Sequence, residues 1–455
     1  MPLIVPRPKA PTGEVKFENL VDLLAPQGEE RRPRRTLPAE WAPQSGVQIT
    51  WPHAGTDWAY MLDEVTETYV RMAYEIAVRE PLLIVTPEPE AVRFLLDKRL
   101  PAEARQRITY FECATNDTWA RDHGFITLLG TDGPELLDFR FNGWGGKFEA
   151  ALDNAINAHL AAQPSHYHSA SSVPSSASSV PSSASSAPSS ASSAPSSASN
   201  PELCSATRRR IAGRYTDYLD FELEGGAIES DGQGTLLTTA ECLLNANRRH
   251  DGDAVPTVDK DQVELLLRER LGVERILWLD HGYLAGDDTD SHIDTLARLC
   301  PGDVIVYVKC TDPDDEHFEA LRAMEDQLRT FRTREGSPYT LIPVPLPHPC
   351  YDNDDDNDND DDAVRYDDSA SPKPATGPTK GERLPATYAN FLIMNDAVLL
   401  PVYNQPDRDA EAIRQMQEAF PHHEIVPIDC RSLIRQHGSL HCCTMQFPRG
   451  VLQEQ

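Results

Sequence analysis

The chain has 455 residues, enough for one large α/β domain or for two or three domains of average size. Hydrophobic residues make up 40% and charged residues 25%, which predicts a soluble globular protein with a sizeable core. The formal net charge of -30 disfavours nucleic acid as a partner and would attract a small cation. No stretch approaches the roughly 18 apolar residues of a membrane span, and the start lacks a secretory signal's apolar run, so we expect a cytoplasmic protein without a membrane partner.

The first predicted elements lie in the N-terminal third of the chain. We expect residues 1–36 to form a flexible extension and residues 37–450 to form a single domain. Apolar residues recur at helical spacing from Trp58 to Ile76. This helix gives way at Pro81 to the apolar, strand-like LLIV. The order of helix then strand indicates α/β organisation.

A low-complexity insertion rich in serine, alanine and proline follows over residues 163–203. Its core is a seven-residue unit repeated four times from Ser171 to Ala198. A coiled coil needs large apolar residues twice in each heptad, and the proline in every unit would break a helix. The insertion is therefore predicted to be a flexible linker.

The second half repeats the order of helix then strand. Residues 262–271 read as a helix before ILWL, 316–333 as a helix before YTLIPV, and 407–420 as a helix before HEIVPID. FLIMNDAVLLPVY predicts a hairpin with Asn395 and Asp396 at its turn, so some strands must be antiparallel. This disfavours a purely parallel barrel or Rossmann sheet. Neither a dinucleotide-binding nor a P-loop motif is present.

A second insertion, over residues 350–383, is rich in aspartate. The stretch from Asp352 to Asp368 holds ten aspartates and one arginine. A calcium-binding EF-hand loop needs glycine at its sixth position and glutamate at its twelfth, where this chain has Asn357 and Ala363. A disordered acidic loop fits the composition better than a calcium site.

Four polar clusters beside apolar strands are the candidates for chemistry: TNDTWARDHG at residues 115–124, LEGGAIE at 223–229, GDDTDSHID at 286–294 and HGSLHCCTMQ at 437–446. Three of them have a purely structural alternative, because Asp, Asn and Thr also cap helices and Glu-Gly-Gly could form a turn before a strand. The acidic residues around His292 could also bind a metal ion, which would make a metal-dependent hydrolase. Nine scattered cysteines without a CxxC pair argue against a disulfide framework and a zinc site, so most are expected to be reduced core thiols.

The clusters make better chemical sense together. A guanidinium carbon is a poor electrophile, so attack on it needs carboxylates that orient the cation, a thiolate nucleophile and an acid that protonates departing ammonia. Residues that could supply this set are Asp122, Glu224, His292, Asp294 and Cys442.

The motifs TWARDHG, EGGAIE with GTLLTTAECLLN, GDDTDSHID and GSLHCCT resemble the ordered motifs of the agmatine deiminase and bacterial peptidylarginine deiminase family. WPHAGTDW near Trp51 and NFLIMND near Asn390 fit the same pattern. The resemblance spans roughly residues 37–448, interrupted by the two insertions. It implies the pentein fold, a five-bladed α/β propeller of repeated ββαβ modules around a central channel.

The resemblance also implies a role for each motif residue. Cys442 would be the nucleophile, although Cys443 stands beside it where the family often has an aliphatic residue. His292 would be the general acid and base, and Glu224 would assist proton transfer or binding. Asp122 and Asp294 would hold the guanidinium, and further substrate-binding residues would be Trp119, Trp144 and Asn390. No metal or organic cofactor is implied.

The sequence also bears on the choice between guanidino substrates. Agmatine ends in a second cation and suits an acidic, aromatic channel, whereas free arginine carries a carboxylate that needs its own partner. Trp144 lies near the place where secreted peptidylarginine enzymes of the family have basic residues. The product of agmatine would be N-carbamoylputrescine, a precursor of putrescine and other polyamines. Peptidyl-arginine deimination and a non-catalytic guanidino-binding protein are the alternatives, and the oligomeric state, including a homo-oligomer, stays open.

Overall fold

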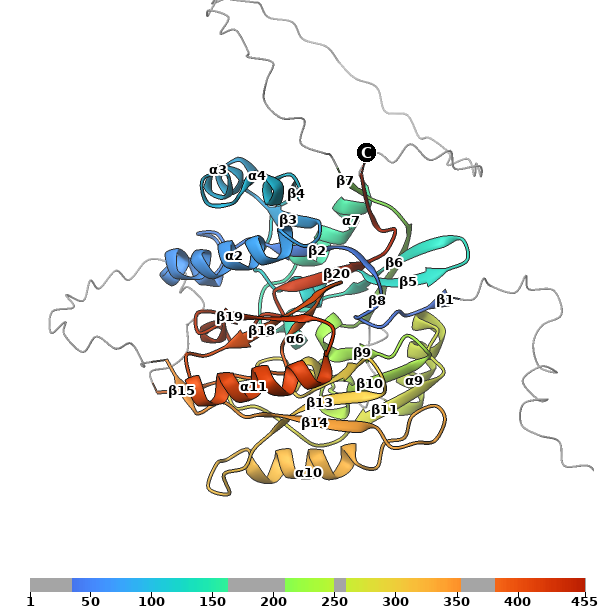
Figure 1. The fold of residues 1–455 in the computed structure, drawn as a ribbon. Helices are drawn as coiled ribbons and strands as arrows, with labels where there is room; N and C mark the ends of the chain where they lie inside the picture. The colour runs from blue at the N-terminus through green and yellow to red at the C-terminus, as the bar shows by residue number, and fades with distance from the viewer. Residues whose placement is uncertain (1–34, 163–208, 249–258, 353–380, 455) are drawn as a thin grey trace, which may run out of the picture. The chain divides into compact units, whose positions relative to one another are not determined.

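The computed structural model describes residues 35–162, 209–248, 259–352 and 381–454 (Figure 1). The predicted N-terminal extension and the two predicted insertions lie almost entirely outside these ranges, as does the stretch considered for calcium. Within the described residues, no helix is both long enough and apolar enough to cross a membrane.

The long helices form where apolar residues recur at helical spacing. The first begins as a short 3-10 helix, η1 (Asp57–Met61), and continues as α2 (Leu62–Ala77), whose buried face includes Tyr69 and Ile76. The strand β3 (Leu82–Thr86) follows, as the sequence predicts. The remaining longer helices are α3 (Pro89–Arg99), α9 (Lys260–Leu271), α10 (Phe318–Leu328) and α11 (Pro406–Ala419).

One predicted helix end was wrong. The helix predicted over residues 316–333 begins two residues later and ends five residues earlier, as α10. The Thr330 hydroxyl donates to the Gln327 carbonyl at 2.6 Å, and the Thr333 amide donates to the Ser337 carbonyl at 2.7 Å. Side-chain and turn hydrogen bonds of this kind compete with the helical ladder, so the chain turns here.

Five of the sheets in the described residues have three or four strands and share one topology. In each, a first strand pairs antiparallel with a second, and the second pairs parallel with a third. These three strands, in order, are β20 (Thr444–Pro448), β2 (Gln44–Thr50) and β3; β5 (Ile126–Gly130), β6 (Gly133–Arg140) and β8 (Arg214–Glu222); β9 (Ile228–Ser230), β10 (Thr235–Thr239) and β11 (Arg275–Leu279); β12 (Ala297–Cys300), β13 (Val304–Lys309) and β14 (Thr340–Pro345); and β17 (Leu392–Ile393), β18 (Ala397–Val402) and β19 (Glu424–Asp429).

A longer helix, of eleven or more residues, connects the second and third strands in four of these sheets. The connecting helices are α2, α9, α10 and α11. A parallel pair needs such a crossover, whereas the antiparallel first pair needs only a short turn. The predicted hairpin is one of these antiparallel pairs, because Ile393 of β17 lies opposite Val398 of β18. The α/β class predicted from the sequence is therefore confirmed.

The first sheet is built from both ends of the described chain. Strand β20, near the C-terminus, pairs antiparallel with β2, near the N-terminus, and Figure 1 shows the red strand beside the blue one. The strand β4 (Ile108–Glu112) extends the first sheet by pairing with β3. The strand β1 (Arg35–Thr36) pairs with β5 and extends that sheet. Short two-stranded pairs join β15 (Cys350–Tyr351) to β16 (Arg383–Leu384) and β7 (Arg209–Ile211) to β21 (Leu452–Glu454).

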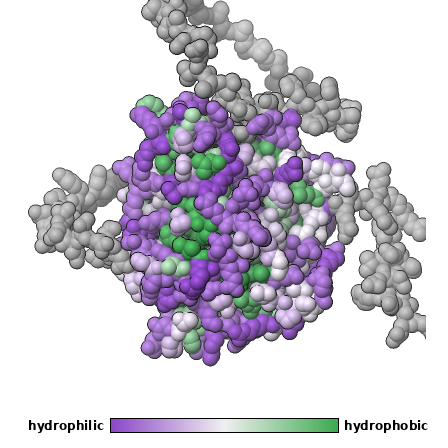
Figure 2. All heavy atoms as spheres, in the orientation of Figure 1, coloured by the Kyte–Doolittle hydropathy of each residue, from purple (hydrophilic) through white to green (hydrophobic). Residues whose placement is uncertain are grey.

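Short helices fill the loops between sheets. They are α4 (Ala102–Arg105), α5 (Ala120–His123), α6 (Gly143–Gly146), α7 (Ile156–Ala161) and α8 (Ala240–Leu243), with the 3-10 turns η2 (Asp153–Ala155), η3 (Gly225–Ala227), η4 (Ile293–Thr295) and η5 (Leu433–Gln436). Figure 2 shows that hydrophilic residues cover most of one face, with hydrophobic residues in patches between them. Residues of the predicted site lie in two of these elements, Asp122 in α5 and Asp294 in η4, and Glu224 stands directly before η3.

Candidate active site

Each predicted catalytic segment stands directly before the first strand of one of the five sheets. Asp122 precedes β5, Glu224 precedes β9 and His292 precedes β12, each by no more than five residues. Asn390 and Cys442 stand two residues before β17 and β20. The segments meet in space, because Asp122 Oδ1 lies 3.6 Å from His292 Nδ1 and Asn390 Nδ2 lies 3.2 Å from Cys442 Sγ.

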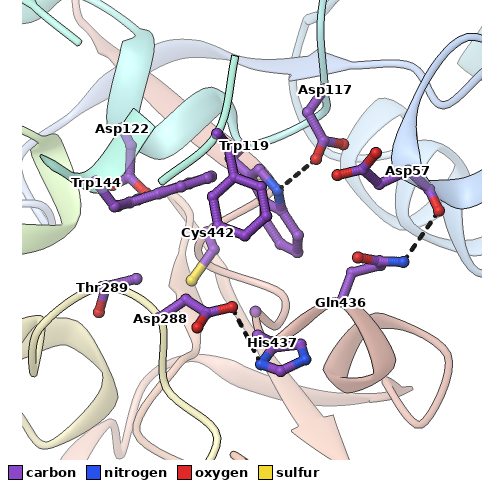
Figure 3. A pocket seen from close by; sticks show the side chains of 12 residues that line it. Asp57, Asp117, Trp119, Asp122, Trp144, Asp288, Thr289, Gln436, His437 and Cys442 are labelled. Atoms are coloured by element: carbon purple, nitrogen blue, oxygen red, sulfur yellow. Dashed lines mark hydrogen bonds and ion pairs between the residues drawn. The ribbon is translucent and has the colours of Figure 1, made fainter. Parts of the chain in front are cut away.

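A cavity opens onto this meeting point, with about 550 Å³ of space that includes its solvent-filled mouth. Figure 3 shows Cys442 and Asp122 at one end and aromatic rings along the walls. The cavity is lined by Asp57, Asp117, Trp119, Asp122, Trp144, Phe148, Asp288, Thr289, Gln436, His437, Gly438 and Cys442.

The thiol of Cys442 lines the cavity, and only 4% of the residue is exposed. Asn390 fixes the position of Cys442 with two hydrogen bonds. Its Nδ2 donates to Sγ at 3.2 Å, and its Oδ1 accepts from the Cys442 amide at 3.3 Å. Burial raises the pKa of the Cys442 thiol well above its usual value, and the carboxylates of Asp294 and Asp122 raise it further. At neutral pH the group is therefore a neutral thiol.

The neighbouring Cys443 does not line the cavity. It is fully buried in the core, and its thiol lies beside the ring hydroxyl of Tyr69. Burial raises its pKa well above the usual range, without a cation to offset the effect. Of the two adjacent thiols, Cys442 is the one that a molecule in the cavity can reach.

Asp122 and Asp294 are both buried, and they are held by different partners. Asp122 Oδ2 accepts from Trp144 Nε1 at 3.0 Å, and Oδ1 accepts from the Gly226 amide at 3.0 Å. Burial raises the pKa of Asp122 to about 6, although His292 opposes the shift. Asp294 Oδ2 accepts from His441 Nδ1 at 2.7 Å, while Oδ1 has no hydrogen-bond partner among the described residues. One carboxylate oxygen there is free to receive a ligand's N–H group.

Burial would raise the pKa of Asp294, but the His441 hydrogen bond and the nearby His292 and Arg298 bring it below its usual value. Asp294 is therefore ionised at neutral pH, even without a ligand. The two carboxylates thus offer a negative site beside a neutral thiol.

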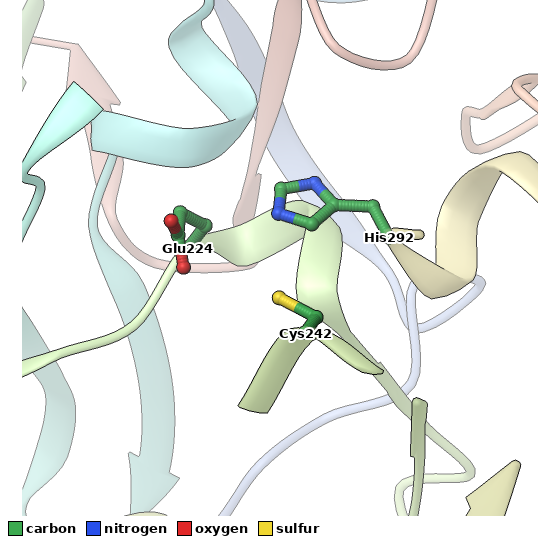
Figure 4. Close-up of side chains that lie close together, drawn as sticks. All are labelled: Glu224, Cys242 and His292. Carbon is green, nitrogen blue, oxygen red and sulfur yellow. The ribbon is translucent and has the colours of Figure 1, made fainter. Parts of the chain in front are cut away.

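His292 is fully buried, and neither ring nitrogen has a hydrogen-bond partner among the described residues. Burial alone would lower its pKa, but Asp122, the Cys242 thiol and Glu224 raise it well above the usual value. Figure 4 shows the ring facing Glu224 and Cys242, whose side-chain oxygen and sulfur lie within 4.8 Å of it. At neutral pH the ring therefore carries a proton that it can donate.

Gly226 explains why these groups can lie so close together. A Cβ atom built at this position would lie 2.6 Å from His292 Nδ1 and 2.8 Å from Asp122 Oδ1. Any side chain there would push the histidine and the carboxylate apart. The Glu-Gly-Gly sequence is therefore a requirement of the site and more than a turn before a strand.

Two contributors to the site were not assigned roles from the sequence. Arg248 is fully buried, and its Nε donates to Glu224 Oε1 at 2.7 Å, which leaves Oε2 without a partner among the described residues. His441 bridges Asp294 and Glu40, since its Nε2 lies 2.9 Å from Glu40 Oε2. In the sequence, Arg248 is visible within the polar stretch NANRR and His441 directly before Cys442. Neither position indicates which carboxylate the side chain contacts.

Of the predicted substrate-binding residues, Trp119 and Trp144 line the cavity, and Asn390 contacts Cys442 instead. The ring centroids of the two tryptophans are 6.4 Å apart at an interplanar angle of 75°. Trp119 Nε1 donates to Asp117 Oδ2 at 3.0 Å. The two rings therefore form a rigid aromatic wall whose polar edges are fixed by aspartates.

The geometry does not support the structural alternative for the two aspartates. Asp122 lies inside α5 and Asp294 lies inside η4, so neither aspartate is at the N-cap position. The N-cap residues are Trp119 and His292, and neither side chain makes a capping hydrogen bond. Asp287 does cap its own turn, accepting from the amides of Thr289 and Ser291.

The acidic residues before His292 point to separate partners. Asp288 contacts His437 at 3.2 Å, and Asp290 pairs with Lys147 at 2.8 Å and with Arg248. Asp287 is engaged by its own turn. Within the described residues, these three carboxylates form no common group with the spacing of a metal site.

A reachable buried cysteine, a protonated histidine and carboxylates with unpartnered oxygen atoms together form a site that suits a cationic group. A family model described as Porphyromonas-type peptidyl-arginine deiminase matches residues 36–448, and the chain belongs to this family. It is therefore a deiminase, a hydrolase that acts on carbon–nitrogen bonds of linear amidines.

Known relatives agree with this assignment over nearly the whole chain. The agmatine deiminase of Stutzerimonas stutzeri (strain A1501) is 30% identical over 418 residues, 90% of this chain and 95% of that protein. A crystal structure from Porphyromonas gingivalis, provisionally named an arginine deiminase, is 42% identical with a TM-score of 0.71 and covers 92% of this chain and 100% of its own. A cysteine-to-serine variant of C. jejuni agmatine deiminase with substrate bound is 28% identical with a TM-score of 0.69, over 93% of this chain and 99% of that one.

Proposed function

We propose that this protein hydrolyses agmatine to N-carbamoylputrescine and ammonia through a covalent intermediate on Cys442. The observation that carries the proposal is the Cys442 thiol at the end of an acidic, aromatic cavity, beside Asp122 and Asp294. The name of the S. stutzeri relative and the substrate-bound C. jejuni structure support agmatine. The family description supports peptidyl-arginine as the second candidate.

Binding begins with the guanidinium group lying flat against the thiol. Asp294 Oδ1, which has no partner among the described residues, and Asp122 accept its N–H groups in charge-assisted hydrogen bonds. The cation offsets the negative charges that raise the pKa of Cys442, so the thiol loses its proton to solvent as the substrate arrives. The nucleophile is therefore formed only when a cation is present.

The Cys442 thiolate then attacks the guanidinium carbon and forms a tetrahedral adduct. His292 gives its proton to one amino group, the carbon–nitrogen bond breaks, and ammonia leaves a thiouronium intermediate. Neutral His292 next takes a proton from water, whose oxygen attacks the same carbon. Collapse of that adduct releases the ureido product and restores the cysteine, with Glu224 keeping His292 protonated between turnovers.

We also propose that residues 37–450 form one domain in which the five sheets are the blades of a five-bladed α/β propeller. Three observations support this arrangement: the five sheets share one topology, the pairing of β20 with β2 joins the chain's two ends, and equivalent segments meet at one site. Each blade would contribute one polar segment to the central channel.

One experiment tests the proposed function against its rivals. Purified protein is incubated with agmatine, arginine and an arginine-containing peptide, and ammonia and ureido product are measured. We expect turnover of agmatine that survives a metal chelator and is lost after thiol alkylation. Release of ureido product from the peptide alone would assign peptidyl-arginine instead, and loss of turnover with the chelator would indicate a metal-dependent hydrolase.

A further inference from the structure

The cavity has a second acidic end that the proposed chemistry does not use. Asp57, in η1, and Asp117, before Trp119, both line the cavity. Figure 3 shows their carboxylates near each other, with the Trp119 ring between them and Cys442. Two carboxylates at this end would be unfavourable unless they meet a positive charge.

The carboxylate of Asp117 is incompletely satisfied. Oδ2 accepts from Trp119 Nε1 at 3.0 Å, but Oδ1 is buried and has no partner among the described residues. Burial raises the pKa of Asp117 to about 8, and the negative charges of Asp153 and Asp57 add to the shift. Burial also raises the pKa of Asp57. A cation between these two groups would relieve both the repulsion and the missing hydrogen bond.

The charges around the cavity favour a cationic ligand over its whole length. Four aspartates line it, and no lysine or arginine does so among the described residues. The single basic side chain, His437, contacts Asp288 at 3.2 Å. A carboxylate at the far end of a substrate would therefore find no cationic partner, whereas an ammonium group would find two carboxylates.

The indole of Trp119 sets the distance between the two ends. A Cβ atom at Gly438, four residues before Cys442, would lie 2.2 Å from Cζ3 of the indole, so the ring's benzene edge touches the cysteine loop. The opposite, nitrogen-bearing edge touches Asp117. The acidic end is thus about one indole length from the nucleophile's loop, a span that a four-carbon chain between two cationic groups can cover.

We propose that Asp57 and Asp117 bind the primary ammonium group of the substrate and select agmatine over neutral-tailed guanidines. This inference rests on the proposed deiminase function. The guanidinium lies at Cys442, the methylene groups lie along Trp119, and the ammonium donates to Asp117 Oδ1 and to Asp57. An arginine within a peptide has no such ammonium group, so the pair favours the free amine.

The test compares agmatine with pentylguanidine, in which a methyl group replaces the ammonium. In the unaltered enzyme we expect kcat/KM to favour agmatine by about a hundredfold, the usual scale for a desolvated charge pair. In Asp117→Asn, whose amide oxygen can still accept from Trp119, the preference should fall below about tenfold while kcat/KM for pentylguanidine changes little. Asp57→Asn should reduce the preference by a smaller factor.

The matched control is Asp288→Asn, which removes a cavity carboxylate that already has a partner in His437 and should keep the preference. Equal use of both guanidines by the unaltered enzyme, or a preference that survives both Asp117→Asn and Asp57→Asn, would overturn the inference. A uniform loss for both substrates in Asp117→Asn would mean that the aspartate only positions Trp119, which also overturns it. If the unaltered enzyme turned over no guanidine at all, the proposed function would fail instead.

Discussion

Two buried polar groups are in contact near the cavity, and their hydrogen-bonding atoms are satisfied to very different degrees. The first, called the catalytic group here after its proposed role, is made of Asp122, Glu224, His292, Asp294 and Cys442. Unpartnered atoms remain on His292, Asp294 and Glu224 among the described residues. In the ion-pair cluster, made of Glu40, Glu229, Arg298 and His441, every side-chain nitrogen and oxygen has a partner. His441 joins the two by its hydrogen bond to Asp294.

The comparison separates a binding role from a structural one. Arg298 donates from all three guanidinium nitrogens, to Glu229, Glu40 and the Phe391 carbonyl. Its Cζ also lies over the Phe391 ring, 4.5 Å from the ring centroid. A network so complete rigidifies the centre of the fold. The catalytic group, in contrast, contains buried polar atoms without hydrogen-bond partners among the described residues, which lowers the stability of the fold. A bound cation and a water molecule would supply the missing partners.

The largest effect should follow from removing the nucleophile. We expect Cys442→Ser to lower kcat by several orders of magnitude, because a hydroxyl in this site cannot replace the thiolate. Cys443→Ser, the matched control, should keep most activity, since that thiol faces the core beside Tyr69. Steady-state ammonia release with both variants decides the matter. Full activity in Cys442→Ser, or a folded but inactive Cys443→Ser, would reverse the assignment.

The carboxylates of the catalytic group come next. Asp122→Asn and Asp294→Asn should each lower kcat/KM by at least about a hundredfold, because the guanidinium loses a charged partner and its orientation. Both constants should suffer, with a higher KM and a lower kcat. Melting curves are the necessary control. A variant with normal kcat/KM but a lower Tm would show that the substituted aspartate has a structural role.

The pH dependence offers a finer test of Asp122. The pKa of its carboxyl in the free enzyme is raised to about 6, and only the ionised form binds the cation. We therefore expect kcat/KM to fall about tenfold per pH unit below about pH 6. The Trp144 hydrogen bond stabilises the ionised form, so Trp144→Phe should move this limb to higher pH. A limb that does not move in this variant would argue that another group controls it.

The smallest kinetic effect should come from the ion-pair cluster. Glu229→Gln keeps one acceptor for Arg298 but removes the charge, so the free energy of unfolding should drop by about 1.5–3 kcal/mol. At low temperature kcat/KM should stay within about threefold of normal. Denaturant unfolding and kinetics on one preparation measure both. A hundredfold kinetic loss without destabilisation would show that the cluster belongs to the catalytic machinery.

Much of the architecture was predictable from local patterns in the chain. Helical spacing of apolar residues located α2, α9 and α11, and the Asn-Asp turn located the hairpin of β17 and β18, because both signals depend on near neighbours. The end of α10 was missed because a threonine hydroxyl and a tight turn compete there with the helix. The residues proposed for catalysis were selected through their motifs, whose order along the chain is visible in the sequence, and the structure brings them together.

What the sequence could not decide is which partner each polar atom has. The tertiary structure alone places Cys442 at the cavity and Cys443 in the core, pairs Arg248 with Glu224, and leaves one oxygen of Asp117 open. These contacts join segments from different sheets, and their distances depend on how the sheets pack. The motifs therefore indicated which residues form the proposed site, while packing between distant segments determined which of their atoms are free to bind.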